Sequence, residues 1–173
     1  MNVWLFGYGS LIWRPDIDYI ERSVARVHGW ARRFWQGSHD HRGLPDKPGR
    51  VVTLVAQPGA VCDGMAYLVS QRTAARTFEA LDHREKNGYQ RHEVRLELPA
   101  QRHEPGIVYI APVDNFAYLG PAPLEDMARQ IHESAGPSGS NRDYLLELAA
   151  VLRDMDAEDE HVYELEAAVR RLS

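Results

Sequence analysis

Apolar residues in the first two thirds of the chain form short runs or alternate with polar residues, the patterns typical of β-strands. They predict strands at about 3–6, 23–35, 51–55, 62–69, 89–98 and 107–111. Segment 37–49 holds three glycines and two prolines and is expected to be a loop, while 57–60 is expected to be a turn. Gly29, inside the second stretch, predicts a bulge or a bend.

Helical spacing predicts one helix among the strands and several after them. Apolar residues recur at i, i+4 and i+7 within 73–83, and the spacing is helical through most of 123–172. Ser140 with Asp143 three positions later predicts the start of one of these helices. Strands around a single helix, followed by a run of helices, indicate an α+β fold. Six bent strands could curl into a small barrel, although periodicity alone does not establish closure.

The length and the charge distribution narrow the class of protein. A chain of 173 residues has room for one domain and not for two full ones, so we expect a single domain over 1–173. The net charge is −5, with a slightly basic first part and a strongly acidic part after residue 100. Aromatic residues interleave with arginines in 22–50, which could mimic a nucleic-acid stacking platform. We favour a strand whose arginines face solvent or pair with the acidic C-terminal third, and expect no nucleic-acid partner.

The expected location is the cytoplasm. No apolar run approaches the roughly 20 residues of a membrane span, and the N-terminus lacks the pattern of a signal peptide. We therefore expect no membrane association. Cys62 is the single cysteine, which excludes an internal disulfide and suits a reducing compartment. Within an alternating run it is more typical of an inert strand residue than of a nucleophile.

A glycine-containing segment follows the first predicted strand directly. Gly7 and Gly9 permit a turn whose backbone N–H groups point into a common space and could hold an anion or an oxyanion. A dinucleotide-binding fingerprint would need a third glycine where Ile12 stands, and the G-x-S-x-G pattern of a nucleophile elbow is absent. By itself the segment fits a structural turn as well as a binding turn.

Charged residues gather where the first predicted helix meets the next strand. Glu85 is a candidate general base there, and His83 is another. An acid between Arg84 and Lys86 is more often a solvated surface charge, and these cations would lower its pKa. Burial would reverse that effect.

A histidine-containing loop raises the possibility of a metal site. His39, Asp40 and His41 lie close in the chain, with His28 upstream, but no second spaced pair and no thiolate accompany them. A zinc site normally needs three or four ligands. We expect no metal and no other cofactor.

Several blocks together resemble one enzyme family. Residues 3–13, which read VWLFGYGSLIW, resemble the N-terminal signature of the ChaC-type, glutathione-specific γ-glutamylcyclotransferases. Further blocks resemble the family in the same order at 32–38, 41–54, 84–89, 118–125, 136–141 and 159–161. The resemblance implies a small, curved, mostly antiparallel β-barrel with flanking helices, the helical part being about 123–172.

The resemblance also implies a reaction and a site. The family splits glutathione into 5-oxoproline and cysteinylglycine without a metal or another cofactor. Glu85 matches the catalytic glutamate of the family. The γ-glutamyl-binding segment corresponds to Gly7, Tyr8, Gly9, Ser10, Leu11 and Ile12.

Some assignments remain open between alternatives. An arginine could bind the glycine carboxylate of glutathione, and Arg42 and Arg50 are both candidates that could equally brace the loop. Tyr144 could line the site or belong to the core. Other γ-glutamyl amines as substrates, or a non-catalytic γ-glutamyl-binding module, are the competing functions. Each helical apolar stripe can be satisfied within the chain, so the sequence predicts no oligomeric state.

Overall fold

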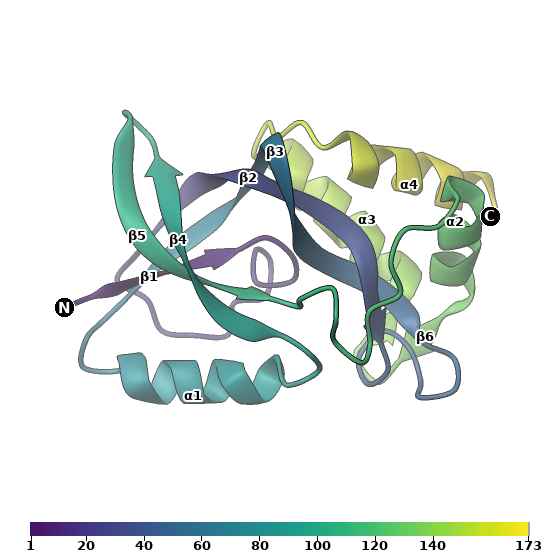
Figure 1. The fold of residues 1–173 in the computed structure, drawn as a ribbon, viewed down its shortest axis with the longest axis horizontal. Coiled ribbons are helices and arrows are strands. Elements are labelled where there is room, and N and C mark those ends of the chain that lie inside the picture. Colours follow the sequence, from purple (N-terminus) through teal and green to yellow (C-terminus); the bar gives the residue numbers. More distant parts are fainter. Residues whose placement is uncertain (173) are drawn as a thin grey trace.

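A computed structural model describes residues 1–172 and shows a closed five-stranded barrel (Figure 1). The barrel order is β1-β3-β2-β4-β5, and only the closing pair, β1 with β5, is parallel. The predicted α+β fold with a mostly antiparallel barrel is therefore confirmed. The strands are β1 (Val3–Gly7), β2 (Glu21–Ser38), β3 (Gly49–Val69), β4 (Gln90–Leu98) and β5 (Arg102–Ile110), with a separate pair formed by β6 (Ala135–Gly136) and β7 (Gly139–Ser140).

Helices lie on two sides of the barrel. In Figure 1, α1 lies alone on one side of the barrel, whereas α2, α3 and α4 lie together on another side, next to β2 and β3. The predicted cap of α3 is confirmed, because Ser140 Oγ accepts a hydrogen bond from the Asp143 N–H at 3.0 Å. The helices are α1 (Ala74–Arg84), α2 (Leu124–Glu133), α3 (Asn141–Asp154) and α4 (Glu160–Arg171). None of the helices within residues 1–172 combines the length and the apolar character needed to cross a membrane.

The prediction of two strands separated by a turn at 57–60 is wrong. β3 runs without interruption over 21 residues beside β2, and the register between the two strands shifts at His28/Trp30. Gly29 has a φ of +85° at this shift, so the predicted irregularity there is confirmed. Residues 57–60 lie opposite it without regular pairing, so the missing N–H of Pro58 interrupts no ladder bond. The long partner strand holds this segment in the sheet despite its turn-like sequence.

Two apolar clusters hold the elements together. The larger joins the barrel interior to α2, α3 and α4, and includes Phe6, Phe34 and Leu148, all fully buried. The smaller joins α1 to β1 and β5 through residues such as Leu5 and Phe78. The C-terminal end of α1, where Glu85 follows, is thereby fixed against the barrel.

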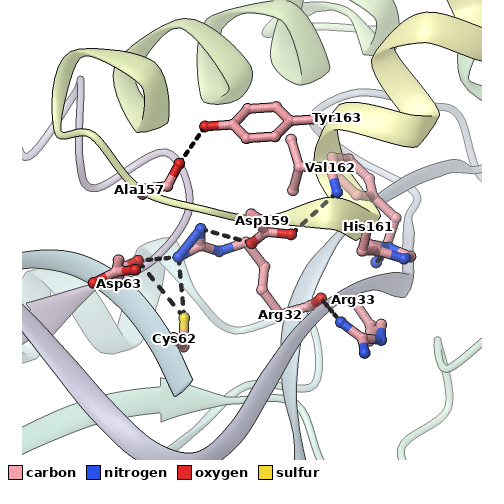
Figure 2. A network of polar contacts seen from close by, with 10 residues as sticks. Arg32, Arg33, Cys62, Asp63, Ala157, Asp159, His161, Val162 and Tyr163 are labelled. Carbon is pink, nitrogen blue, oxygen red and sulfur yellow. Dashed lines mark hydrogen bonds and ion pairs between the residues drawn. The ribbon is translucent and has the colours of Figure 1, made fainter. Parts of the chain in front are cut away.

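A buried arginine ties the barrel to α4 (Figure 2). Arg32 of β2 is fully buried, and its guanidinium contacts Asp159 Oδ2 at 3.2 Å and Cys62 Sγ at 3.0 Å and donates to the Asp63 carbonyl. Asp159 also caps α4, because its Oδ1 accepts from the Val162 N–H at 3.1 Å. Arg32 thus pairs with the acidic C-terminal third as predicted. Burial raises the pKa of the Cys62 thiol to about 11, which keeps it protonated.

Candidate active site

Two adjoining cavities open where four distant segments meet. Cavity A has a volume of about 280 Å³ and cavity B about 50 Å³. Both are lined by Ser10, Glu85, Tyr89 and Tyr144. Cavity A is lined in addition by Arg14, Asp16, Gly37, Ser38, Asp40, His41, Arg42, Val51, Arg84, Asn87 and Ser138, and cavity B by Phe6, Tyr8, Gly9, Leu11, Val52 and Tyr109. Their shared wall brings together Glu85 and the segment of residues 7–12, here called the glycine segment, which are the two features singled out in the sequence.

Glu85 is placed by the end of α1. It is the C-cap residue, and its N–H donates to the Leu81 carbonyl at 2.8 Å. The chain then turns through Gly88, whose φ is +98° and where a Cβ would approach Asn115 Oδ1 to 2.6 Å. The turn directs the Glu85 side chain into both cavities, where it is 19% exposed.

Burial sets the protonation of Glu85. The pKa of its carboxyl group is raised, chiefly by burial, while the Arg84 charge lowers it and the Asp40 charge raises it. The lowering expected from neighbouring cations is thus outweighed. A carboxyl group with a raised pKa can accept and return a proton closer to neutral pH.

Arg84 is only a weak partner of Glu85 because its guanidinium is committed elsewhere. It donates to the carbonyls of Arg14 at 2.9 Å and Pro15 at 3.1 Å, and to Ser10 Oγ at 3.2 Å. Its Nε lies 3.9 Å from Glu85 Oε1. Arg84 therefore fixes the segment after β1 against the end of α1.

Polar side chains hold the turn that follows Glu85. Asn87 Nδ2 donates to Asp40 Oδ1 at 2.9 Å, and the Asn87 carbonyl accepts from Gln36 Nε2 at 3.1 Å. Gln36 is fully buried and exchanges two hydrogen bonds with Asn115. The turn that carries Glu85 is thus anchored to β2 and to the loop after it.

The glycine segment is folded tightly and leaves donors free. The Ile12 N–H donates to the Gly9 carbonyl at 2.9 Å. A Cβ on Gly7 would come within 2.7 Å of Leu11 Cβ, and one on Gly9 within 2.9 Å of Val52 Cγ2, so both positions require glycine. Within residues 1–172, no hydrogen bond uses the N–H groups of Gly9, Ser10 or Leu11. Gly9, Ser10 and Leu11 line cavity B, and free N–H groups at this position could bind an anionic oxygen.

Three tyrosines at the site stay neutral. Burial raises the pKa of Tyr8, Tyr89 and Tyr144. The Tyr8 hydroxyl donates to the Tyr109 carbonyl at 2.6 Å, and the Tyr89 hydroxyl donates to the Val52 carbonyl at 2.8 Å. These side chains shape the cavities and are poor bases at neutral pH.

Comparison with known proteins identifies the family. The family model described as ChaC-like protein matches residues 3–172. The chain belongs to the ChaC-like family. This ChaC-like protein is 44% identical to gamma-glutamylcyclotransferase 2-3 of Arabidopsis thaliana, over 99% of this chain and 90% of the relative. It is 41% identical to glutathione-specific gamma-glutamylcyclotransferase 1 of Homo sapiens, over 96% and 78% of the two chains. The crystal structure of a yeast gamma-glutamylcyclotransferase specific to glutathione superposes with a TM-score of 0.94, at 33% identity over 98% and 96%.

The structure separates the other candidate residues of this ChaC-like protein. His83 is exposed on α1 and lines neither cavity. Arg50 also lies outside both cavities and braces the fold through the carbonyls of Phe34 at 2.9 Å and Gly120 at 2.8 Å. Arg42 and Tyr144 face cavity A, and the Arg42 guanidinium lies 5.6 Å from the centre of the Tyr144 ring.

Gly7 and Ile12, the two ends of the glycine segment of the ChaC-like protein, lie outside both cavities. Gly7 ends β1, and Ile12 is buried in the main apolar cluster, so neither lines a cavity. Three further residues at the cavities, Arg14, Asn87 and Tyr89, were not predicted from the sequence, where only their adjacency to recognised motifs signals them. Among the residues described, no three His, Cys, Asp or Glu side chains are arranged to hold a metal ion.

Proposed function

We propose that this protein is a glutathione-specific γ-glutamylcyclotransferase, which cleaves glutathione to 5-oxoproline and cysteinylglycine. The observation that carries the proposal is a largely buried carboxyl group, that of Glu85, in the wall of the same two cavities that residues with unused backbone N–H groups line. The names of the relatives and the close match to the yeast structure support the same activity.

The reaction needs a folded substrate and a proton carrier. The α-amine of the γ-glutamyl group attacks its own γ-carbonyl carbon and closes a five-membered lactam, and the bond to the cysteinyl nitrogen breaks. The attacking nitrogen, initially an ammonium, loses two protons and the departing nitrogen gains two, so no water is consumed. Holding amine and carbonyl in contact can contribute about 7–11 kcal/mol to the barrier reduction.

Each part of the site has a proposed role. Glu85 takes a proton from the attacking nitrogen and delivers one to the departing nitrogen. The N–H groups of Gly9, Ser10 and Leu11 bind the γ-glutamyl carboxylate or the oxyanion that develops on the carbonyl. The Tyr8 ring forms a wall of the cavity that holds the γ-glutamyl group.

Substitution of Glu85 tests the proposal. Glu85→Gln keeps the size of the side chain but cannot accept the proton, so kcat should fall by about 10²- to 10⁴-fold. The measurement is 5-oxoproline formation from glutathione by purified protein without added metal. Glu79→Gln, an exposed position on α1 outside both cavities, is the matched control and should retain full activity.

The same assay separates the competing functions. Glutathione and γ-glutamylalanine are offered together, and the proposal requires that glutathione be consumed preferentially. Equal consumption would indicate a cyclotransferase for γ-glutamyl amines in general. Binding of glutathione by the wild-type protein with no product would indicate a binding module, and near-normal turnover by Glu85→Gln would exclude Glu85 as the proton carrier.

A further inference from the structure

Two arginines line cavity A, Arg14 from the segment after β1 and Arg42 from the β2–β3 loop. Neither Arg14 nor Arg42 forms an ion pair within residues 1–172, although both line the cavity. Arg42 is only 6% exposed, and its Nη1 donates to the Ser140 carbonyl at 3.0 Å. A buried cation without a paired carboxylate is costly unless a ligand supplies the negative charge.

Arg14 leaves its whole guanidinium available. Its backbone N–H donates to the Ser10 carbonyl at 2.7 Å and its carbonyl accepts from Arg84, which fixes the backbone beside the cavity. No hydrogen bond in the part of the chain that the structure describes uses its side-chain N–H groups. The pKa of Arg42 is lowered chiefly by burial and further by the nearby Arg14 charge, whereas Glu147 and Asp143 raise it. An anion bound beside both guanidinium groups would relieve this repulsion.

The arrangement of the cavities assigns an end of the substrate to the arginines. Glu85 lines both cavities, so the bond that breaks lies at their junction. Gly9, Ser10 and Leu11, whose N–H groups are free, line cavity B, which we assign to the γ-glutamyl group. The part of glutathione beyond the breaking bond must then extend into cavity A. That part is cysteinylglycine, which ends in a carboxylate.

We propose that Arg14 and Arg42 bind the glycine carboxylate of glutathione and so make the site specific for a γ-glutamyl peptide with that charge. Guanidinium groups bind carboxylates through paired, charge-assisted hydrogen bonds, which suits this role. The inference rests on the proposed function and deepens it. The sequence left Arg42 and Arg50 as candidates for this contact. The proposal selects Arg42 and adds Arg14, because the Arg50 guanidinium donates to the Phe34 and Gly120 carbonyls outside the cavities.

Two substrates that differ only in this charge test the proposal. One is glutathione, and the other is glutathione whose glycine carboxylate is converted to a carboxamide. Wild-type protein should favour glutathione by about 10- to 100-fold in kcat/KM, mainly through KM. Arg14→Ala and Arg42→Lys should lower kcat/KM for glutathione and leave that for the carboxamide nearly unchanged. Arg129→Ala, an exposed arginine of α2 outside both cavities, is the matched control and should not change the preference.

Other outcomes would overturn the proposal in distinguishable ways. An equal loss with both substrates would place the arginines at the γ-glutamyl end or in a structural role. An unchanged preference in Arg14→Ala and Arg42→Lys would exclude the carboxylate contact. Arg14→Ala changes an exposed side chain and keeps the test valid if a variant of buried Arg42 fails to fold. Absence of product from glutathione with wild-type protein would instead refute the proposed function itself.

Discussion

The carboxyl group of Glu85 has two charged neighbours with opposite effects on its pKa. Arg84 lowers that pKa and Asp40 raises it, while burial raises it more than either charge changes it. The side-chain hydrogen bond from Asn87 holds Asp40 at the cavity, so its negative charge is a fixed part of the site. Asn87 therefore influences the protonation of Glu85 indirectly, because it holds the Asp40 charge in place.

Asp40→Asn should move the acidic limb of the activity profile to lower pH. The substitution removes a negative charge that raises the pKa of Glu85, and the amide oxygen can still accept from Asn87. With a lower pKa, Glu85 stays ionised, and able to act as a base, to lower pH. The measurement is kcat/KM for glutathione against pH.

Asp46→Asn is the matched control for this prediction. Asp46 is exposed, lies on the same β2–β3 loop and lines neither cavity, so its profile should superpose on that of the wild type. A limb that stays in place or moves to higher pH in Asp40→Asn would show that the Asp40 charge does not act on Glu85.

At the scale of secondary-structure elements, α4 is joined to the barrel by its own capping residue. Asp159 accepts from the N–H of Val162 with one oxygen and contacts buried Arg32 with the other (Figure 2). On the same turn, His161 Nε2 accepts from the Phe34 N–H at 3.0 Å. The Phe34 ring in turn packs edge-on against Tyr144, which lines both cavities. The start of α4 thus supports the wall of the site from behind.

Two substitutions of Asp159 should separate its two contacts. Asp159→Asn keeps a capping oxygen but leaves the buried Arg32 charge without its partner, which should cost about 3 kcal/mol of unfolding free energy. Asp159→Ala also removes the cap and should cost about 1 kcal/mol more. Urea unfolding measures both values. Glu158→Gln, at the exposed neighbouring position, should change stability little.

The contrary result for Asp159 is simple to recognise. If Asp159→Asn unfolds at the same urea concentration as the wild type, the ion pair with Arg32 contributes nothing to stability. The contact between β2 and α4 would then depend on the Phe34–His161 hydrogen bond and on apolar packing.

At the scale of the whole molecule, one apolar cluster spans the barrel and the three C-terminal helices. The site draws on the segment after β1, the β2–β3 loop, the end of α1 and α3. We propose that residues 1–173 form one cooperative domain, because neither the barrel nor the helices would keep their shared core if separated. Ligand bound at this site would stabilise every element that forms it.

Thermal unfolding of Glu85→Gln with glutathione tests this. All four tryptophans lie within residues 4–35, so their fluorescence follows the barrel, whereas circular dichroism follows the helices. Both signals should show one shared transition. Glutathione at about 100 times its Kd should stabilise the folded state by about 2.7 kcal/mol and shift both signals together. Separate transitions, or a shift in one signal only, would contradict a single domain, and glycine at the same concentration is the control.

Local patterns in the sequence determined a large part of this protein. Strand and helix positions, the bulge at Gly29 and the cap at Ser140 depend on neighbours a few positions away, and such interactions can be read along the chain. The continuity of β3 does not follow from such local patterns. The segment 57–60 has turn residues, yet pairing between two long strands keeps it within one strand.

The tertiary structure alone decided the properties that arise between distant segments. Closure of the barrel depends on the pairing of β1 with β5, and the burial of Glu85 depends on α1, β3 and α3 meeting at one place. Whether an arginine faces the cavity or braces the fold likewise depends on which carbonyls surround it, as Arg42 and Arg50 show. Residue type and spacing identify the groups that could react, but desolvation and charge proximity depend on distances in space, which only the folded chain establishes.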